Sequence, residues 1–254
     1  MNSSLAKTEK PFISIITVLR NGEKTLEACI QSVIGQAYEG VEFIVIDGGS
    51  TDGTLDILRR YDNRIAYWVS ESDRGIYDAM NKGTRHVNGE RILFLGCDDT
   101  LSADLRTVAP LLIHDDTIYY GDAYWPGRQR LYDGPFTTAK LARTNICHQA
   151  VFYPRAVFEK YAFNLRYSLQ ADWELNMRCF SDPAFRFQYI PVQVAVYNDL
   201  HGLSSVRRDL ALEQDYIALM WRHFPWPIAL WRSAIVLGGR FLHQLGWKGM
   251  TRDS

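Results

Sequence analysis

The stretch Val41–Tyr61, VEFIVIDGGSTDGTLDILRRY, joins an apolar run to a helical pattern through a turn that contains two adjacent glycines. The segment Phe43–Ile46 is apolar on both faces, which is typical of a buried strand in a parallel sheet. Leu55 and Leu58 then recur at the spacing of an amphipathic helix. Asp47 ends the strand, and ligands bind at the carboxyl edge of open α/β sheets. The stretch therefore predicts a strand, a polar edge and a helix.

The same alternation extends on both sides of this stretch. We expect strands at 12–19, 65–69 and 91–95, and helices near 26–34, 76–87 and 102–113. This order of strands and helices predicts a parallel sheet with helices on both faces.

The second half is less regular. Strands are expected at 117–125 and 149–154, and residues 185–197 form either one long strand or a strand pair. Helices are expected at 172–180 and 209–224, and residues 126–144 form a long excursion.

Composition narrows the class of protein. The chain has 254 residues and a formal net charge of −1, which gives no support for nucleic-acid binding. Its four cysteines contain no CxxC pair, so we expect neither a disulfide framework nor a zinc site. The polar start lacks the apolar core of a signal peptide, and the expected compartment is the reducing cytosol.

Motifs exclude the commonest nucleotide-binding folds. The turn Thr17–Gly22 has one glycine, so the dinucleotide fingerprint is missing, and the chain has neither a P-loop nor a GxSxG elbow. Acids instead stand at strand ends, as Asp47, Asp98 and Asp99. Such carboxylates suit Mg²⁺ or Mn²⁺, which binds one or two of them together with substrate phosphate oxygens.

Seven segments carry a resemblance to a known family. The strongest are SIITVLRN (14–21), VIDGGSTDGT (45–54), DRGIYDAMNKG (73–83) and GERILFLGCDDTL (89–101). The weaker ones are CHQAVFYPR (147–155), ADWELNMR (171–178) and HGLSS (201–205). In this order they resemble the family 2 glycosyltransferases of the GT-A fold, especially those of bacterial exopolysaccharide and lipopolysaccharide assembly, such as colanic-acid-type sugar transferases.

The resemblance implies an α/β GT-A fold, with a Rossmann-like and mostly parallel central sheet flanked by helices. It implies a glycosyltransferase domain at 11–208, and we expect a disordered N-terminus at 1–10. Within that domain, 11–99 would be the nucleotide-sugar half and 100–208 the acceptor half. A helical, Trp-rich segment would follow at 209–254.

The resemblance also implies site residues. Those expected to bind the nucleotide-sugar are Thr17, Leu19, Asn21, Asp47, Asp73, Asp78, Asn81, Lys82 and Asp98. Asp98 and Asp99 would hold Mn²⁺ or Mg²⁺, with Asp99 favoured. Gly96 departs from the commoner D-x-D-D spelling, because it stands where the first acid would be.

The resemblance favours Asp172 as the catalytic base, with Glu174 as the second choice. The structural alternative for Asp172 is an N-cap of its helix. His148, Gln149 and His201 are candidates for acceptor binding or site support, although histidines are more often structural.

These features favour an inverting, metal-dependent hexosyltransferase that uses a UDP-sugar and a saccharide or lipid-linked saccharide acceptor. A metal-dependent nucleotidyltransferase and a non-catalytic nucleotide- or sugar-binding relative are the alternatives. The tail 220–250 interleaves Trp and Phe with Arg and Lys, which is typical of an interfacial helix. It predicts a peripheral enzyme on the inner face of the cell membrane; the alternative is packing on the domain or in a homo-oligomer.

Overall fold

The computed structural model describes residues 12–200 and 208–244, with side chains up to residue 239. The N-terminal segment 1–10, expected to be disordered, lies outside the described residues, as does the HGLSS motif.

The first half forms the parallel sheet that the sequence predicts. Its strands are β1 (Ile13–Leu19), β2 (Val41–Asp47), β3 (Tyr67–Ser70) and β4 (Arg91–Phe94). They pair in parallel in the order β3-β2-β1-β4. Leu19 stands opposite Asp47, which in turn stands opposite Ser70, so the carboxyl ends of three strands form one edge.

Helices cover both faces of these strands, as predicted. Helices α1 (Leu26–Ile34) and α2 (Thr54–Arg60) pack on one face, and α3 (Ile76–Gly83) packs on the other. A short 3₁₀ helix, η1 (Asp62–Arg64), precedes β3. Helix α3 ends four residues before the predicted end, at Gly83. A Cβ atom at Gly83 would lie 2.7 Å from Ile16 Cγ2, so glycine lets α3 approach the sheet closely.

The second half contains more elements than the sequence indicates. They are β5 (Thr100–Leu101), α4 (Leu105–Val108), η2 (Ala109–Leu111), β6 (Thr117–Trp125), β7 (Arg130–Tyr132), α5 (Thr138–Leu141), η3 (His148–Ala150), β8 (Val151–Pro154), α6 (Arg155–Lys160), α7 (Ala171–Ser181) and β9 (Arg186–Val196). The excursion at 126–144 thus contains a hairpin strand and a short helix. Residues 186–196 form one strand, which decides between the two expectations for this segment.

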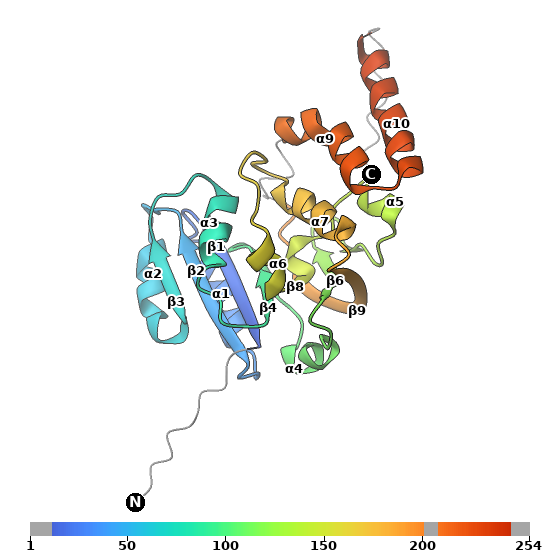
Figure 1. Ribbon diagram of the computed structural model, residues 1–254. Helices are drawn as coiled ribbons and strands as arrows, with labels where there is room; N and C mark the ends of the chain where they lie inside the picture. Colours follow the sequence, from blue (N-terminus) through green and yellow to red (C-terminus); the bar gives the residue numbers. More distant parts are fainter. Residues whose placement is uncertain (1–11, 201–207, 245–254) are drawn as a thin grey trace, which may run out of the picture.

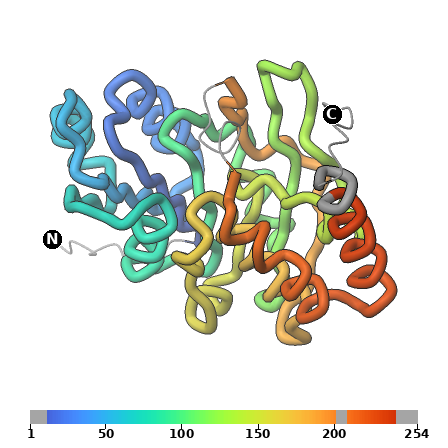
Figure 2. The backbone as a smooth tube through the Cα atoms, turned by 90° about the horizontal axis from the view of Figure 1, so that it is seen from above, coloured from blue at the N-terminus to red at the C-terminus, as the bar shows by residue number. Residues whose placement is uncertain are grey.

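The second half joins the first through one antiparallel strand. Strand β8 pairs antiparallel with both β4 and β6, and β9 runs parallel to β6. The sheet order becomes β3-β2-β1-β4-β8-β6-β9-β5, with β7 paired to β6. Figure 2 shows the two halves side by side, the first in blue and cyan and the second in green to orange.

Two helices end the described chain. Helix α9 (Leu210–His223) packs on α7, where the Trp173 and Tyr216 rings lie 5.8 Å apart, and α10 (Trp226–Gln244) packs on α9. Figure 1 shows both helices beyond α7, at the upper right of the molecule and on the side away from α2. Among the described residues, no helix has both the length and the apolar character needed to cross a bilayer.

Candidate active site

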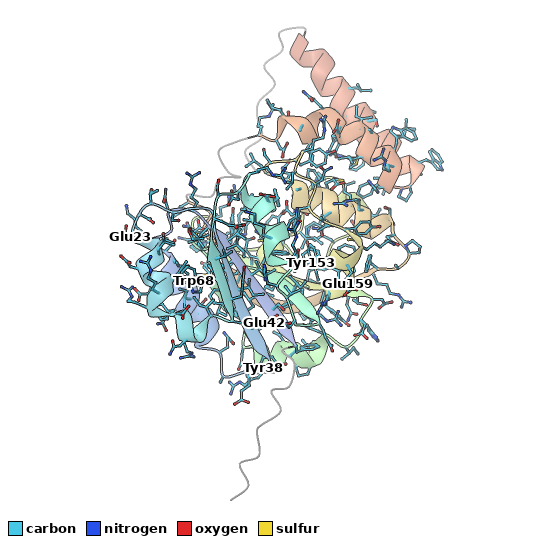
Figure 3. The ribbon with its side chains drawn as sticks, turned by 60° about the vertical axis from the view of Figure 1, so that its left-hand side comes forward. Glu23, Tyr38, Glu42, Trp68, Tyr153 and Glu159 are labelled. Carbon is cyan, nitrogen blue, oxygen red and sulfur yellow. The ribbon has the colours of Figure 1, made fainter. Side chains whose placement is uncertain are left out.

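Two loops meet at the carboxyl edge of β1 and β2. Asn21 adopts a positive φ of 58°, and its Oδ1 accepts a hydrogen bond of 2.9 Å from Thr51 N. Gly22 N donates to Thr54 Oγ1 at 2.9 Å, and Glu23 N donates to Asp52 Oδ2 at 3.1 Å. These contacts fix the predicted nucleotide loop against the turn that follows β2. Figure 3 shows Glu23 at this end of the sheet, with Tyr38 and Glu42 at the opposite end.

Asp47 lies at this edge but faces its own turn. Its carboxylate is completely buried and accepts hydrogen bonds from Ser50 N (2.9 Å), Ser50 Oγ and Ser70 Oγ (2.5 Å). Asp47 therefore stabilises the turn that follows it, which is a common function of Asp in an Asp-Gly pair. Three hydrogen bonds also compensate for the burial of a charged group at a strand end.

Thr17 and Leu19 are buried in the sheet. Thr17 Oγ1 lies 3.6 Å from Cys29 Sγ, under α1, and Leu19 joins the apolar cluster on the same face. Their side chains support the loop that Asn21 begins.

The DRG segment forms a second loop beside the first. Asp73 Oδ1 accepts a hydrogen bond of 2.8 Å from Gly75 N, and a Cβ atom at Gly48 would lie 2.3 Å from Asp73 Oδ2. Gly48 therefore leaves the space that the Asp73 carboxylate occupies. The loop and the turn after β2 thus bring Asp73 next to Asp47's turn.

Helix α3 contributes three of the predicted residues. Asp78 accepts hydrogen bonds from Arg74 N and its guanidinium; although burial raises the pKa of this carboxyl, these bonds lower it overall. Lys82 Nζ donates to Ser72 O at 2.8 Å and pairs with Glu71 at the same distance. Both side chains hold the DRG loop in place.

Asn81 lies apart from these residues. Its Nδ2 donates to Phe163 O and its Oδ1 accepts from Phe163 N, each at 2.9 Å. Both ends of the amide are therefore used to join α3 to the segment before α7.

Asp98 and Asp99 differ in exposure. Asp98 is exposed, whereas Asp99 is buried and accepts hydrogen bonds of 2.8 Å from Gln149 Nε2 and Asn198 N. Burial, together with the neighbouring charge of Asp98, raises the pKa of Asp99 to about 6. A Cβ atom at Gly96 would lie 2.4 Å from Asp99 Oδ2, so the Asp99 carboxylate fills the space beside this glycine.

Asp172 lies in the first turn of α7 and is almost fully buried. Its Oδ1 accepts a hydrogen bond of 2.6 Å from Tyr77, and its Oδ2 accepts one of 2.7 Å from Asn145 Nδ2. His148 Nδ1 lies 3.4 Å from the same Oδ2. The carboxylate is thus held by α3 and by the loop before β8, and it does not cap its own helix.

Glu174 points away from this group. It forms an ion pair of 2.9 Å with Arg178, and burial raises the pKa of its carboxyl. A step of two residues turns a helix by about 200°, so Asp172 and Glu174 face opposite sides of α7. His148 and Gln149 do join the site, and His201 lies outside the described residues.

The acids fit a divalent ion that binds mainly through substrate oxygens. Within 12–200 and 208–244, no group of three or more His, Cys, Asp or Glu side chains could hold a metal ion alone. However, each Asp99 oxygen accepts one hydrogen bond and keeps a second lone pair, and Asp98 is open to solvent. One or two carboxylates with phosphate oxygens are the ligand set that Mg²⁺ prefers.

Several supporting residues were not predicted. They are Ser50, Ser70, Tyr77, Asn145 and Asn198. Ser50 lies within a quoted motif, and Tyr77 lies in the DRG segment. The contacts of the others depend on pairings between distant segments, which no local pattern reveals.

Two depressions on the protein surface lie away from this site. One surface depression is lined by the end of α1, the start of β2 and Arg64, and another by Glu90, Arg91, Asp115 and Pro154–Ala156. Neither includes the acids at the carboxyl edge. The converging acids and their hydrogen-bond partners therefore define the candidate site.

Comparison with known proteins identifies the family. The model of glycosyl transferase family 2 matches residues 14–190, and the chain belongs to this family. A PGL/p-HBAD biosynthesis glycosyltransferase of Mycobacterium bovis is 40% identical over 204 residues, which cover 77% of this chain and 80% of that protein.

Solved structures confirm the fold. A mannosyltransferase from Pyrobaculum calidifontis, PcManGT, in complex with GDP-Man and Mn²⁺, aligns with a TM-score of 0.68 and 20% identity, covering 89% of this chain and 70% of that one. Residues 1–349 of S. aureus TarS, in complex with UDP-GlcNAc, give a TM-score of 0.65 and 20% identity, covering 82% of this chain and 64% of that one. The GT-A fold expected from the sequence is therefore confirmed.

Proposed function

We propose that this protein is an inverting glycosyltransferase that moves a hexosyl group from a UDP-sugar to the hydroxyl of a lipid-linked saccharide. One observation carries the proposal: Asp172, on the acceptor half, and Asp99, at the strand-end acid motif, are both held by the short segment 145–149. A base and a donor-side acid thus face one region from opposite halves of the sheet.

Asp172 would act as the general base. The acceptor oxygen attacks the anomeric carbon, its proton passes to Asp172, and the bond from that carbon to the diphosphate breaks to release UDP. Tyr77 and Asn145 each donate one hydrogen bond, so they hold the carboxylate in a single orientation while each oxygen keeps a free lone pair. A positioned base of this kind contributes roughly 10²–10⁴-fold to the rate.

The donor would lie along the carboxyl edge of β1, β2 and β4. Asn21, Asp73 and Lys82 lie in or next to the loops there, and Asp98 is the exposed acid that follows β4. Mn²⁺ or Mg²⁺ held by Asp98 and Asp99 would neutralise charge on the departing diphosphate. Asp47, through its hydrogen bond from Ser50, would set the shape of the loop that binds the nucleobase of the donor.

The two solved structures of the same fold support this assignment, since PcManGT contains GDP-Man with Mn²⁺ and TarS contains UDP-GlcNAc. The nucleotides in these two structures have different nucleobases, uracil in one and guanine in the other, so the choice of uracil needs its own test. A lipid-linked acceptor is part of the proposal because the Trp-rich, cationic C-terminal segment suits an enzyme that works at a bilayer; the 40% identical relative is named for PGL/p-HBAD biosynthesis. An enzyme with such an acceptor would act at the cytoplasmic face of the membrane.

The test begins with a thermal-shift panel of UDP, GDP, ADP and CDP, each with and without Mn²⁺. A nucleotide at about 100 times its Kd should stabilise the fold by about 2.7 kcal/mol. Release of UDP from UDP-sugars, with and without Mn²⁺, then measures turnover. A stronger shift with GDP than with UDP would overturn the uracil assignment, and absence of turnover with every sugar would favour a binding protein.

A further inference from the structure

Helix α10 presents an apolar surface to solvent. Trp226 is 69% exposed, Trp231 is 46% exposed and Leu237 is 54% exposed. Isolated apolar side chains are common on protein surfaces, but a contiguous apolar face usually marks an interaction site.

The exposed side chains of α10 share one half of the helix. Successive residues of a helix are about 100° apart around its axis, so the exposed apolar positions of α10 fall side by side and form a continuous face. We call it the α10 face; its members, all exposed, are Trp226, Pro227, Leu230, Trp231, Ala234, Ile235, Leu237 and Gly238. None of these residues is charged or polar.

The opposite side of α10 contacts α9. Ala229 and Ser233 are buried there, and Trp221 Nε1 donates to Ser233 Oγ at 3.1 Å. Arg232 is the one charged residue between positions 226 and 239, and its Nε donates to Tyr216 at 2.8 Å. Packing of α10 on the protein therefore uses one side of the helix and leaves the apolar side uncovered by the described residues (Figure 1).

The charge of the C-terminal segment indicates whether a second copy of the chain or a lipid bilayer covers this face. The sequence from 216 to 252 contains no Asp or Glu, although the whole chain has a net charge of −1. Its cations include Arg222, Arg232, Arg240 and Lys248. A second copy of this chain would add a second segment with the same excess of cations and no acid of its own to pair with them. An anionic bilayer complements both the charge and the Trp-rich apolar side.

We propose that α10 lies flat on an anionic lipid bilayer, with the α10 face inserted at the level of the headgroups. The Tyr216 hydroxyl donates to Ala142 O, and α9 packs on α7, which carries Asp172 in its first turn. Docking through α10 thus holds the acceptor half next to the bilayer. The use of this arrangement for a lipid-linked acceptor rests on the proposed function, whereas vesicle binding does not.

Flotation with vesicles tests the proposal. The full chain is mixed with phosphatidylcholine vesicles that contain about one-third phosphatidylglycerol, and with vesicles of phosphatidylcholine alone. We expect binding to the anionic vesicles that weakens at high salt. The double variant Trp226→Ser, Leu230→Ser should reduce the bound fraction about tenfold or more, because the two large apolar side chains that it removes are each more than half exposed on the α10 face.

The matched control is Leu111→Ser, Ile113→Ser, which changes two exposed apolar residues outside α10 and should bind vesicles as the parent does. Melting curves and UDP release without vesicles should be unchanged in both variants, which separates this proposal from the proposed function. Equal flotation of the parent and the α10 variant would overturn the proposal. A parent dimer that becomes a monomer in the α10 variant, with no vesicle binding, would show instead that a second copy covers the face.

Discussion

Gln149 Nε2 donates a hydrogen bond of 2.8 Å to Asp99 Oδ2, and this contact joins the acid motif of the first half to the loop before β8. His148 lies 3.4 Å from Asp172, and Asn145 donates to the same carboxylate. A single loop therefore supports both acids, which are far apart in sequence. Its position follows from β8, which pairs with β4 and β6 at the centre of the sheet.

Asp172→Asn should abolish sugar transfer and retain nucleotide binding. An amide cannot take the proton of the acceptor hydroxyl, so we expect kcat to fall by roughly 10²–10⁴-fold. The measurement pairs a transfer assay with calorimetry of UDP binding. Glu174→Gln is the matched control, because Glu174 faces the other side of the helix and pairs with Arg178. Transfer by the Asp172 variant at a near-parental rate would eliminate this base.

Asp99→Asn should reduce metal-dependent turnover, and it should also destabilise the fold. Two hydrogen-bond donors face the Asp99 carboxylate, so an amide NH₂ would meet one of them at a cost of about 1–3 kcal/mol. The exposed Asp98→Asn variant carries no such cost and isolates the effect on metal. UDP release is measured across a Mn²⁺ titration for both variants, with melting curves. Parental rates at every Mn²⁺ concentration in both variants would remove the metal assignment.

Asn81→Ala distinguishes a structural role from donor binding. The change removes two hydrogen bonds of 2.9 Å to the Phe163 backbone and should destabilise the protein by about 2 kcal/mol. UDP affinity of the folded protein should stay unchanged, as measured by calorimetry below the melting temperature. The control is Asn164→Ala, which removes one hydrogen bond at an exposed site. A large rise in the Kd for UDP would instead place Asn81 in the donor site.

The first half of the fold could be predicted because its signals are local. Apolar runs that end in acids identify buried parallel strands, so the position of Asp47 at a sheet edge follows from sequence alone. The antiparallel insertion of β8 could not be predicted, since the neighbour of a strand is set by the packing of the whole sheet. The partners of Asp172 were missed for the same reason: Tyr77 and Asn145 come from different segments.

Stability should fall as the pH decreases through the range in which His223 is protonated in the unfolded chain. Burial, with the nearby charges of Arg222 and Arg178, lowers the pKa of His223 to about 4. The unfolded chain therefore binds more protons than the folded one between about pH 6.5 and pH 4, and stability is lost on acidification. We expect a loss of about 1 kcal/mol between about pH 7.5 and pH 5, discounted because the ring is partly exposed. In His223→Gln this component should disappear, which denaturant unfolding at the two pH values can measure; an equal pH effect in both proteins would contradict the assignment.

Gly96→Ala should impair catalysis although it adds a single methyl group. The new Cβ would lie 2.4 Å from Asp99 Oδ2 and 3.1 Å from Asp98 Oδ1, so the Asp99 carboxylate must move and its contact with Gln149 must break. A displacement of about 1 Å at a reacting site can reduce the rate about a hundredfold, and we expect a loss of kcat/KM of that order. The control is Gly239→Ala in α10, where no atom lies within 4 Å of the added Cβ; it should keep full activity and gain about 0.5–1 kcal/mol of stability. If Gly96→Ala retains parental kcat/KM and Mn²⁺ dependence, the space beside Asp99 has no part in the reaction, and the acid motif operates through Asp98 alone.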